Sequence, residues 1–169
     1  TVLWGMGELH LDVVLEQVRR ETGMAVTVGA PKVAYRETIG AAAVEVEGKV
    51  SKQNGGTGQY ARVVLRVEKF DGVFAFENAI KGGVVPSMYI PAVEKGVRQA
   101  MAQGPLGYPV TGVKVTLLDG DYHAVDSSDL AFAAAAKEGA LDGLLRAKPQ
   151  QLEPVMGVTV DAPSANAGD

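Results

Sequence analysis

The strongest constraint on the fold is a pair of alternating segments on either side of a glycine-rich loop. Apolar and polar residues alternate over residues 44–51, and the alternation resumes over residues 60–70. Residues that alternate in this way point to opposite sides of a strand, so each segment predicts a β-strand with one buried face. Two such strands joined by residues 53–59 predict a β-hairpin, and the alternation fixes its register.

Two further segments have the 3.6-residue spacing of apolar side chains that is typical of helices. The first has Pro near its start and Gly-Pro after its end, and the second is rich in Ala and begins at a capping sequence, Asp-Ser-Ser-Asp. The first helix is predicted from about Ile90 to Gly104-Pro105, and the second from Asp126–Asp129 to about Ala147. Additional strands are predicted over residues 73–78 and 110–118. Elements in this order predict an α+β domain with one core.

The sequence at each end of the chain predicts only part of a domain. An amphipathic helix over residues 8–23 is followed by extended segments over 25–28 and 32–39, which is about half of a small α+β domain. Near the other end, residues 154–160 predict a strand with no partner after it. We therefore expect a piece of a longer protein with three regions: 1–39, 40–150 (the one complete domain) and 151–169.

Composition excludes several classes of function. The 169 residues include no Cys and two His, which excludes disulfides and thiolate metal sites, and we expect no metal site. Gly-Lys-Ser and Gly-Lys-Thr are absent, so no P-loop, no GTP hydrolysis and no cofactor are expected for this chain. No apolar run is long enough to span a membrane, and we expect a cytoplasmic protein. The net charge of −4 argues against binding nucleic acid by charge alone.

The glycine-rich loop is a candidate contact for nucleic acid. A loop that binds phosphate in a P-loop is followed by a helix, whereas a strand follows here. Lys49, Lys52, Arg62 and Arg66 lie on the two arms of the hairpin, and no acidic residue occurs between positions 49 and 66. A polar loop on basic arms suits contact with a nucleic-acid backbone. The alternative is that these charges form only a solvated face.

The segment from Asp121 to Ser128 is a second candidate. It contains the residue types of a Ser-His-Asp triad, but within eight consecutive positions, whereas a triad is assembled from separate elements. A His in a loop before a helix can instead hydrogen-bond RNA or stack on a base. Two hypotheses therefore start from His123: a free-standing enzyme that uses Ser127 or Ser128, and an RNA contact.

Several motifs in the chain, taken together and in order, resemble elongation factor G, the bacterial ribosomal translocase. The end of its third domain is similar to Gly5-Met6-Gly7-Glu8-Leu9-His10-Leu11 and Pro31–Ile39. Its fourth domain is similar to Gly55-Gly56-x-Gly58-Gln59-Tyr60, Lys81-Gly82-Gly83-Val84-x-Pro86, Tyr89–Val93, Gly107–Val110, Tyr122-His123-x-Val125-Asp126-Ser127-Ser128 and Ala131-Phe132. The start of its fifth domain is similar to Leu152–Met156.

The resemblance implies a fold for each region. The central region is expected to be similar to the second domain of a small-subunit ribosomal protein, with a left-handed β-α-β crossover. The first region is expected to belong to a ferredoxin-like α+β domain, and the last to be the first strand of another domain. The hairpin loop and the loop around His123 are expected to lie together at the far end of the central domain. We call this set the tip: Gln53, Asn54, Gly55, Gly56, Thr57, Gly58, Gln59, Asp121, Tyr122 and His123.

The resemblance also implies a function. In this family the tip enters the decoding region of the small ribosomal subunit and contacts the messenger–transfer RNA duplex during translocation. The expected partners are the ribosome, its rRNA and the tRNA–mRNA complex; no membrane partner and a monomeric chain are expected. GTP and Mg²⁺ are expected to bind a domain outside this chain. The family often has a basic residue where this chain has Thr57, which favours an alternative: a paralogue that serves ribosome recycling, rescue or protection.

Overall fold

A computed structural model describes residues 3–29, 33–52, 58–157 and 159. The chain forms two compact units, Thr1–Val33 and Ala34–Asp169, which are described separately below. The second contains every described residue of the tip.

The first unit contains one helix, α1 (Glu8–Thr22), as the sequence predicts. Gly23 ends it in the left-handed conformation (φ 66°), and its N–H donates to Arg19 O at 2.9 Å. The strand expected over residues 25–28 is wrong, because the described residues of this segment have no regular structure. A strand is held by hydrogen bonds to a neighbouring strand, and the described part of this unit contains none.

The second unit is built on a four-stranded sheet with the order β2-β3-β5-β4. The strands are β2 (Ala43–Lys52), β3 (Gln59–Lys69), β4 (Phe74–Asn78) and β5 (Val113–Asp121). The predicted hairpin is confirmed: β2 and β3 are antiparallel, from Ala43 opposite Glu68 to Lys52 opposite Gln59. Strand β5 lies between β3 and β4, so these two strands follow one another in the sequence but are not neighbours in the sheet.

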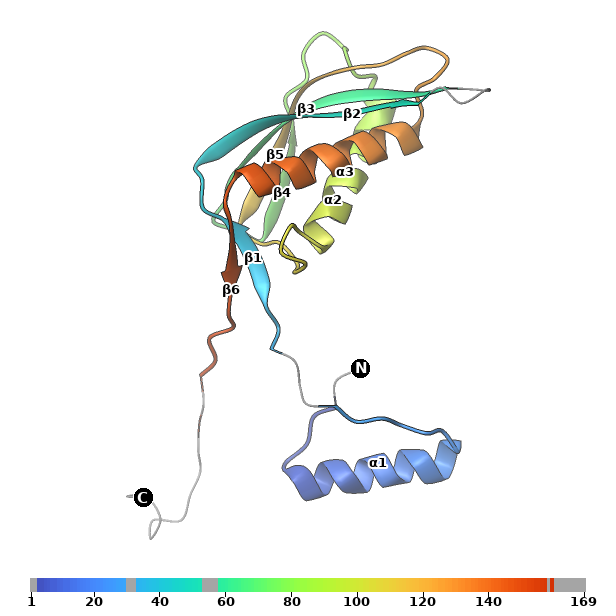
Figure 1. Cartoon of the computed structure of the whole chain (residues 1–169), viewed down its shortest axis with the longest axis vertical. Helices are drawn as coiled ribbons and strands as arrows, with labels where there is room; N and C mark the ends of the chain where they lie inside the picture. Colours follow the sequence, from blue (N-terminus) through green and yellow to red (C-terminus); the bar gives the residue numbers. More distant parts are fainter. Residues whose placement is uncertain (1–2, 30–32, 53–57, 158, 160–169) are drawn as a thin grey trace. The chain divides into compact units, whose positions relative to one another are not determined.

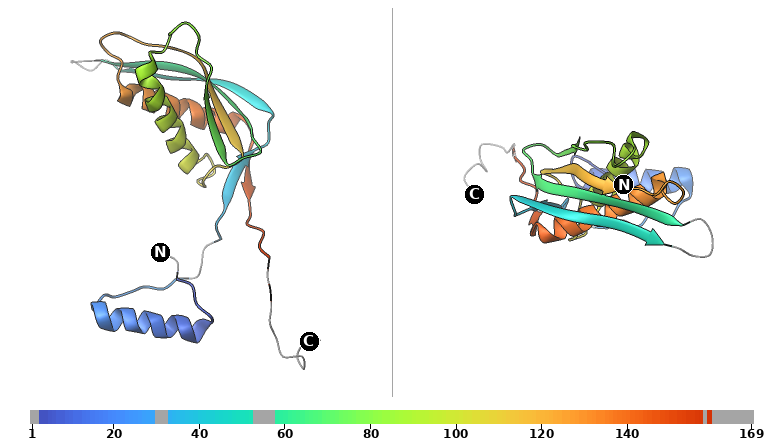
Figure 2. Two further views of the ribbon diagram at one scale, coloured as in Figure 1. Left: turned by 180° about the vertical axis from the view of Figure 1, so that it is seen from behind. Right: turned by 90° about the horizontal axis from the view of Figure 1, so that it is seen from above.

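Two helices cover one face of this sheet (Figures 1 and 2). A short 3₁₀ helix, η1 (Ser87–Tyr89), leads into α2 (Ile90–Ala102), which connects the parallel neighbours β4 and β5. The second helix, α3 (Asp129–Arg146), crosses β2 and β3. The crossing is close at Gly48, where an added Cβ would lie 2.0 Å from Ala135 O. Both helices are predicted correctly, and the α+β fold class is confirmed.

A two-stranded ribbon stands at the other end of the unit from the paired ends of β2 and β3, where Lys52 lies opposite Gln59 (Figure 1). It consists of β1 (Arg36–Ile39) and β6 (Pro149–Leu152), which are antiparallel. The sequence predicts that residues 34–39 belong to the first region, whereas the pairing of β1 with β6 places them with the second unit. The strand expected over residues 154–160 is not found in the described residues 153–157 and 159. The nearest strand, β6, ends earlier, where its pairing with β1 ends.

The core lies between the sheet and the two helices. Its largest fully buried apolar side chains include Phe132, Leu65, Leu117 and Leu144. They come from both layers, so the helices hold the sheet's inner face away from water, and each fully buried side chain of this kind contributes about 1.5–3 kcal/mol to folding. Within the described residues, no helix combines the length and apolar character needed to cross a bilayer.

Candidate functional site

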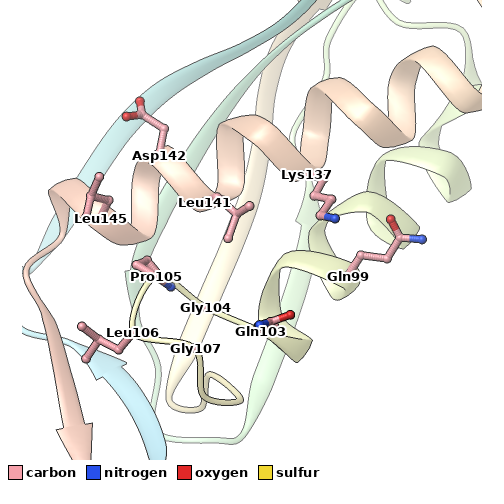
Figure 3. Close-up of a pocket in the computed structure, with 10 residues that line it drawn as sticks. All are labelled: Gln99, Gln103, Gly104, Pro105, Leu106, Gly107, Lys137, Leu141, Asp142 and Leu145. Carbon is pink, nitrogen blue, oxygen red and sulfur yellow. The ribbon is translucent and has the colours of Figure 1, made fainter.

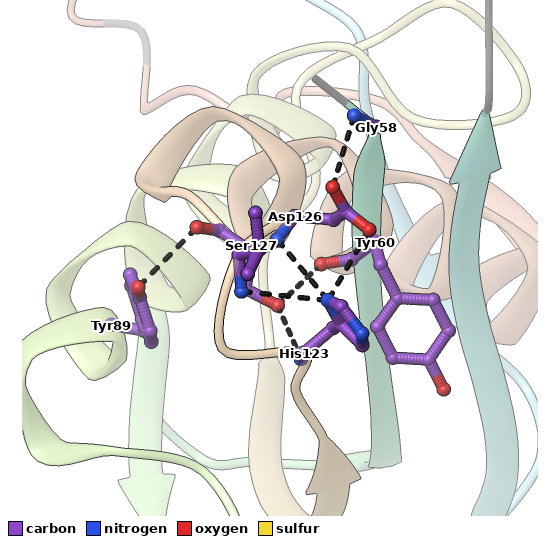
Figure 4. A network of polar contacts seen from close by, with 7 residues as sticks. Gly58, Tyr60, Tyr89, His123, Asp126 and Ser127 are labelled. Atoms are coloured by element: carbon purple, nitrogen blue, oxygen red, sulfur yellow. Dashed lines mark hydrogen bonds and ion pairs between the residues drawn. The ribbon is translucent and has the colours of Figure 1, made fainter. Parts of the chain in front are cut away.

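The loop that precedes α3 is joined to the base of the hairpin by a set of hydrogen bonds (Figure 4). Gly58 N donates to Asp126 Oδ1 at 3.0 Å, and Tyr60 N donates to Asp126 O at 2.9 Å. The Ser127 hydroxyl donates to Tyr60 O at 2.7 Å and accepts from His123 N at 2.8 Å. The described residues of the tip's two segments, far apart in sequence, are therefore held side by side.

A β-bulge positions two carboxylates of the tip end on the outer face of the sheet. The register between β3 and β5 shifts between Val64 and Leu65, leaving Leu118 as the extra residue. Before the bulge, the odd-numbered residues of β5 point inward, and after it Gly120 does. Asp119 and Asp121 consequently point outward, next to the side chains of β3. The sequence analysis ended this strand at residue 118 and so missed their orientation.

Asp121 is engaged by donors from both sides. Tyr60 Oη donates to Asp121 Oδ2 at 2.9 Å, and Tyr122 N donates to Asp121 Oδ1 at 2.9 Å. The bond from the phenol to the carboxylate, together with partial desolvation, raises the pKa of Tyr60 above its ordinary value of 10.0. This carboxylate stabilises the end of β3 from within the domain.

Two of the four predicted basic residues are paired with carboxylates in the sheet. Arg62 Nε lies 2.7 Å from Glu47 Oε2, and its Nη1 lies 3.6 Å from Asp119 Oδ2. Arg66 Nε donates to Glu45 Oε1 at 3.0 Å. The pKa values of both guanidinium groups are raised, first by their hydrogen bonds to Glu47 and Glu45 respectively. Their charges are compensated by carboxylates that lie outside residues 49–66 of the sequence.

The other two predicted basic residues are Lys49 and Lys52. Both are exposed on β2, and Lys49 lies opposite Arg62 in the antiparallel pair β2-β3. The predicted tip residues Gln53, Asn54, Gly55, Gly56 and Thr57 lie outside the described residues. Gly58 is half-buried and Gln59 exposed.

The loop is supported from behind by α3 and η1. Ser128 caps α3, and its hydroxyl accepts from Ala131 N at 3.2 Å, which confirms the predicted capping segment. Tyr89 Oη lies 3.4 Å from Ser127 O, and the Tyr89 ring stacks on Phe132 with centroids 4.7 Å apart. Since Phe132 is fully buried, this stack connects the loop to the core.

The geometry opposes the hydrolase hypothesis. The Ser127 hydroxyl is directed at Tyr60 O and at the main chain of His123, and the His123 ring faces Asp126 through Nδ1 (3.2 Å to Oδ2). A nucleophilic Ser requires its hydroxyl on the ring nitrogen of the base. The described residues contain no cluster of three His, Asp or Glu side chains that could hold a metal ion.

The groove shown in Figure 3 lies away from the tip, between the end of α2, the segment that follows it and α3. It contains none of the predicted site residues. Its lining residues are Gln99, Gln103, Gly104, Pro105, Leu106, Gly107, Lys137, Leu141, Asp142 and Leu145. Most of this lining is uncharged, and it has no arrangement of catalytic groups.

The contact between Asp126 and Gly58 is not predicted by the sequence. Asp126 lies in the expected capping sequence and in the candidate segment from Asp121 to Ser128, whereas the cap is Ser128 and the Asp126 carboxylate contacts Gly58 N. An available signal was the surplus of capping residues in Asp126-Ser127-Ser128-Asp129. One helix needs one cap, so the others were free to bind elsewhere.

Comparison with known proteins agrees with this architecture. The family model described as elongation factor G, domain IV, matches residues 31–148, and the model described as elongation factor G, domain III, matches residues 1–30. The chain belongs to the elongation factor G family. The resemblance stated from the motifs is thereby confirmed, and with it the assignment to a family of translation elongation factors.

A crystal structure of a protein from Thermus thermophilus is also similar to this chain, with 45% identity and a TM-score of 0.79. The match covers 88% of this chain and 22% of that protein. The chain thus spans about a fifth of the length of that protein. The second unit corresponds to domain IV of the family, and the start of β3 and the segment before α3, which the hydrogen bonds join, lie at the end of that domain opposite β1 and β6.

Proposed function

We propose that this chain is the RNA-facing arm of a ribosomal translocase. In the full-length protein, the tip of domain IV reaches the decoding region of the small subunit and supports movement of tRNA and mRNA. The chain acts by position and shape, without bond chemistry of its own. GTP binding and hydrolysis belong to another domain of the full-length protein.

The observation that carries this proposal is the union of the hairpin and the 121–128 loop at one end of the domain. Their hydrogen bonds leave Tyr122 and His123 exposed beside the start of β3. An exposed aromatic ring and an imidazole can stack on bases and hydrogen-bond to RNA. The chain that carries these two side chains belongs to the elongation factor G family, whose factors act in translation.

The charges near the tip suit transient binding. Carboxylates of the same domain engage Arg62 and Arg66, so the basic arms contribute less net positive charge than their number indicates. RNA affinity that rests on many phosphate contacts is strong and depends steeply on salt. An arm that leaves the ribosome after each step works better with few such contacts, and we expect weak, salt-sensitive RNA binding from the isolated chain.

The alternative is a paralogue that serves ribosome recycling, rescue or protection. Thr57, where the family often has a basic residue, favours it. The two functions are separated by adding the full-length protein to a translation extract depleted of its translocase. Restored translocation supports the proposal, whereas ribosome splitting without translocation supports the paralogue.

The role of the tip is tested by His123→Ala in the full-length protein, with single-round translocation followed by stopped-flow fluorescence. We expect translocation to slow by about tenfold or less, as for the loss of one hydrogen bond. The matched control is Val73→Ala, since Val73 is 65% exposed beyond the other end of β3. Equal rates for His123→Ala and the unmodified protein would remove this residue from the function.

A further inference from the structure

The His123 ring is held by one edge. Asp126 N and Val125 N donate toward Nδ1 at 3.3 and 3.4 Å, and Asp126 Oδ2 lies 3.2 Å from the same nitrogen. The side chain is 59% exposed. No described residue makes a hydrogen bond to Nε2, so this edge of the ring is available to a ligand.

One nitrogen cannot both accept from the main chain and donate to a carboxylate. With the ring proton on Nε2, Nδ1 accepts the two N–H groups; with the proton on Nδ1, it donates to Asp126 Oδ2. We favour the second arrangement, because in the first the Asp126 carboxylate would lie 3.2 Å from a lone pair of Nδ1, and the two main-chain contacts, at 3.3 and 3.4 Å, are long. The Asp126 carboxylate then occupies Nδ1, and Nε2 is the nitrogen left to accept a hydrogen bond.

Asp126 also connects this ring to the hairpin. Its Oδ1 accepts from Gly58 N, its main-chain oxygen accepts from Tyr60 N, and its side chain is only 25% exposed. The main chain of His123 is fixed separately, through Ser127 Oγ. One residue therefore sets the position of the ring relative to the strand that follows the hairpin loop.

We propose that Asp126 is a positioning residue for His123: it occupies Nδ1 so that the ring presents Nε2 to a hydrogen-bonding group of RNA, and it holds that ring in register with the start of β3. The part of this inference that concerns RNA rests on the proposed function. The positioning part depends only on the contacts within the chain.

The positioning is tested on the 169-residue chain by NMR, without ribosomes. Asp126→Ala is expected to shift the ring nitrogen resonances of His123 and the amide resonance of Gly58. Asp126→Asn should preserve most of the Gly58 shift, because the amide oxygen can still accept its N–H. Asp129→Ala is the matched control: it removes the same charge three residues later, at an exposed position. The ring of His10, the other histidine, serves as an internal reference. Unchanged His123 resonances in Asp126→Ala would overturn the positioning.

The RNA part is tested by a double-mutant cycle in the full-length protein. Asp126→Ala should slow translocation by about threefold to tenfold, as expected for one hydrogen bond, and Asp126→Asn should recover much of the rate. In a His123→Ala background, Asp126→Ala should add nothing, because it acts through the missing ring. A merely structural role predicts the same slowing in both backgrounds, which would overturn the inference.

The failures are distinguishable. If His123→Ala slows translocation and Asp126→Ala does not, the inference is wrong and the proposed function stands. If His123→Ala has no effect, the RNA role of both residues is wrong, and the NMR comparison still decides the positioning of the ring.

Discussion

The two ends of the second unit use the same type of contact in different surroundings. Near β1, the Glu37 carboxylate accepts from Leu106 N at 3.0 Å and from Tyr108 N at 3.2 Å, in a residue that is only 1% exposed. At the tip, the Asp126 carboxylate accepts from Gly58 N at 3.0 Å, and its side chain is 25% exposed. Each carboxylate ties a loop to a strand.

The two contacts differ in whether water can replace the carboxylate as the acceptor of the main-chain N–H. A main-chain N–H that loses a buried acceptor stays unpaired, whereas one near the surface can bond to water. The contact of Glu37 should therefore stabilise the fold, and that of Asp126 should mainly set local geometry. A domain anchored firmly at one end can keep more exposed contacts at the other, which is consistent with the proposed binding and release of RNA.

The largest expected effect is the loss of the buried carboxylate. Glu37→Ala should lower the free energy of unfolding by about 3 kcal/mol, since two hydrogen bonds to a charged group are lost. Asp126→Ala should cost about 1 kcal/mol, because its contact is partly exposed. Urea denaturation of the 169-residue chain, followed by circular dichroism, measures both. Equal costs at the two ends would contradict the comparison.

The glycines beside the two carboxylates provide a second, smaller test. A Cβ on Gly104 would lie 2.2 Å from Glu37 Oε1 and 2.5 Å from Val110 Cγ2, both in buried residues. A Cβ on Gly58 would lie 2.9 Å from Asp126 Cγ, in a side chain that can move toward solvent. Gly104→Ala should therefore cost about 1–3 kcal/mol through overpacking.

Gly58→Ala serves as the paired variant. Its smaller strain is offset by the reduced freedom of the unfolded chain, a gain of about 0.4–1 kcal/mol, so we expect little net change. The same urea denaturation applies. A tip variant as unstable as Gly104→Ala would show that the tip is as tightly packed as the anchored end.

Local patterns predicted the elements of the second unit but not their pairing. Alternation located β2 and β3, and cap and stop signals located α2 and α3, because these features are written in neighbouring residues. The insertion of β5 between β3 and β4 depends on where a crossover helix returns the chain, for which no local signal exists. The strand expected over residues 25–28 was wrong, and the described part of the one expected over 154–160 is not a strand, for a related reason: apolar alternation predicts a strand only where a partner is present.

At the tip, too, some features could be predicted from the sequence and others could not. The resemblance to the family led us to expect its two loops together, and their described residues are joined. The pairing of Asp119 with Arg62 and of Asp121 with Tyr60 was not predictable, because the bulge at Leu118 reverses which residues of β5 face β3. The proposed positioning of the His123 ring by Asp126 rests on contacts between loops that the sequence does not indicate.

The smallest expected effect is on the titration of the Tyr60 hydroxyl. It tests whether a contact at the exposed tip persists in water. The bond to Asp121 raises the pKa of Tyr60 above 10.0, so the folded chain holds this proton more tightly than the unfolded chain does. The stabilisation from this bond is therefore complete below the ordinary pKa and is lost as the pH rises through the raised value. Asp121→Ala should bring the titration of Tyr60, followed by the ¹³Cζ resonance, back toward its ordinary range. Tyr122→Phe, which leaves the carboxylate in place, should not change it. If the titration of Tyr60 is the same with and without the Asp121 carboxylate, the bond is not maintained in solution, and the tip is held by the Asp126 and Ser127 contacts alone.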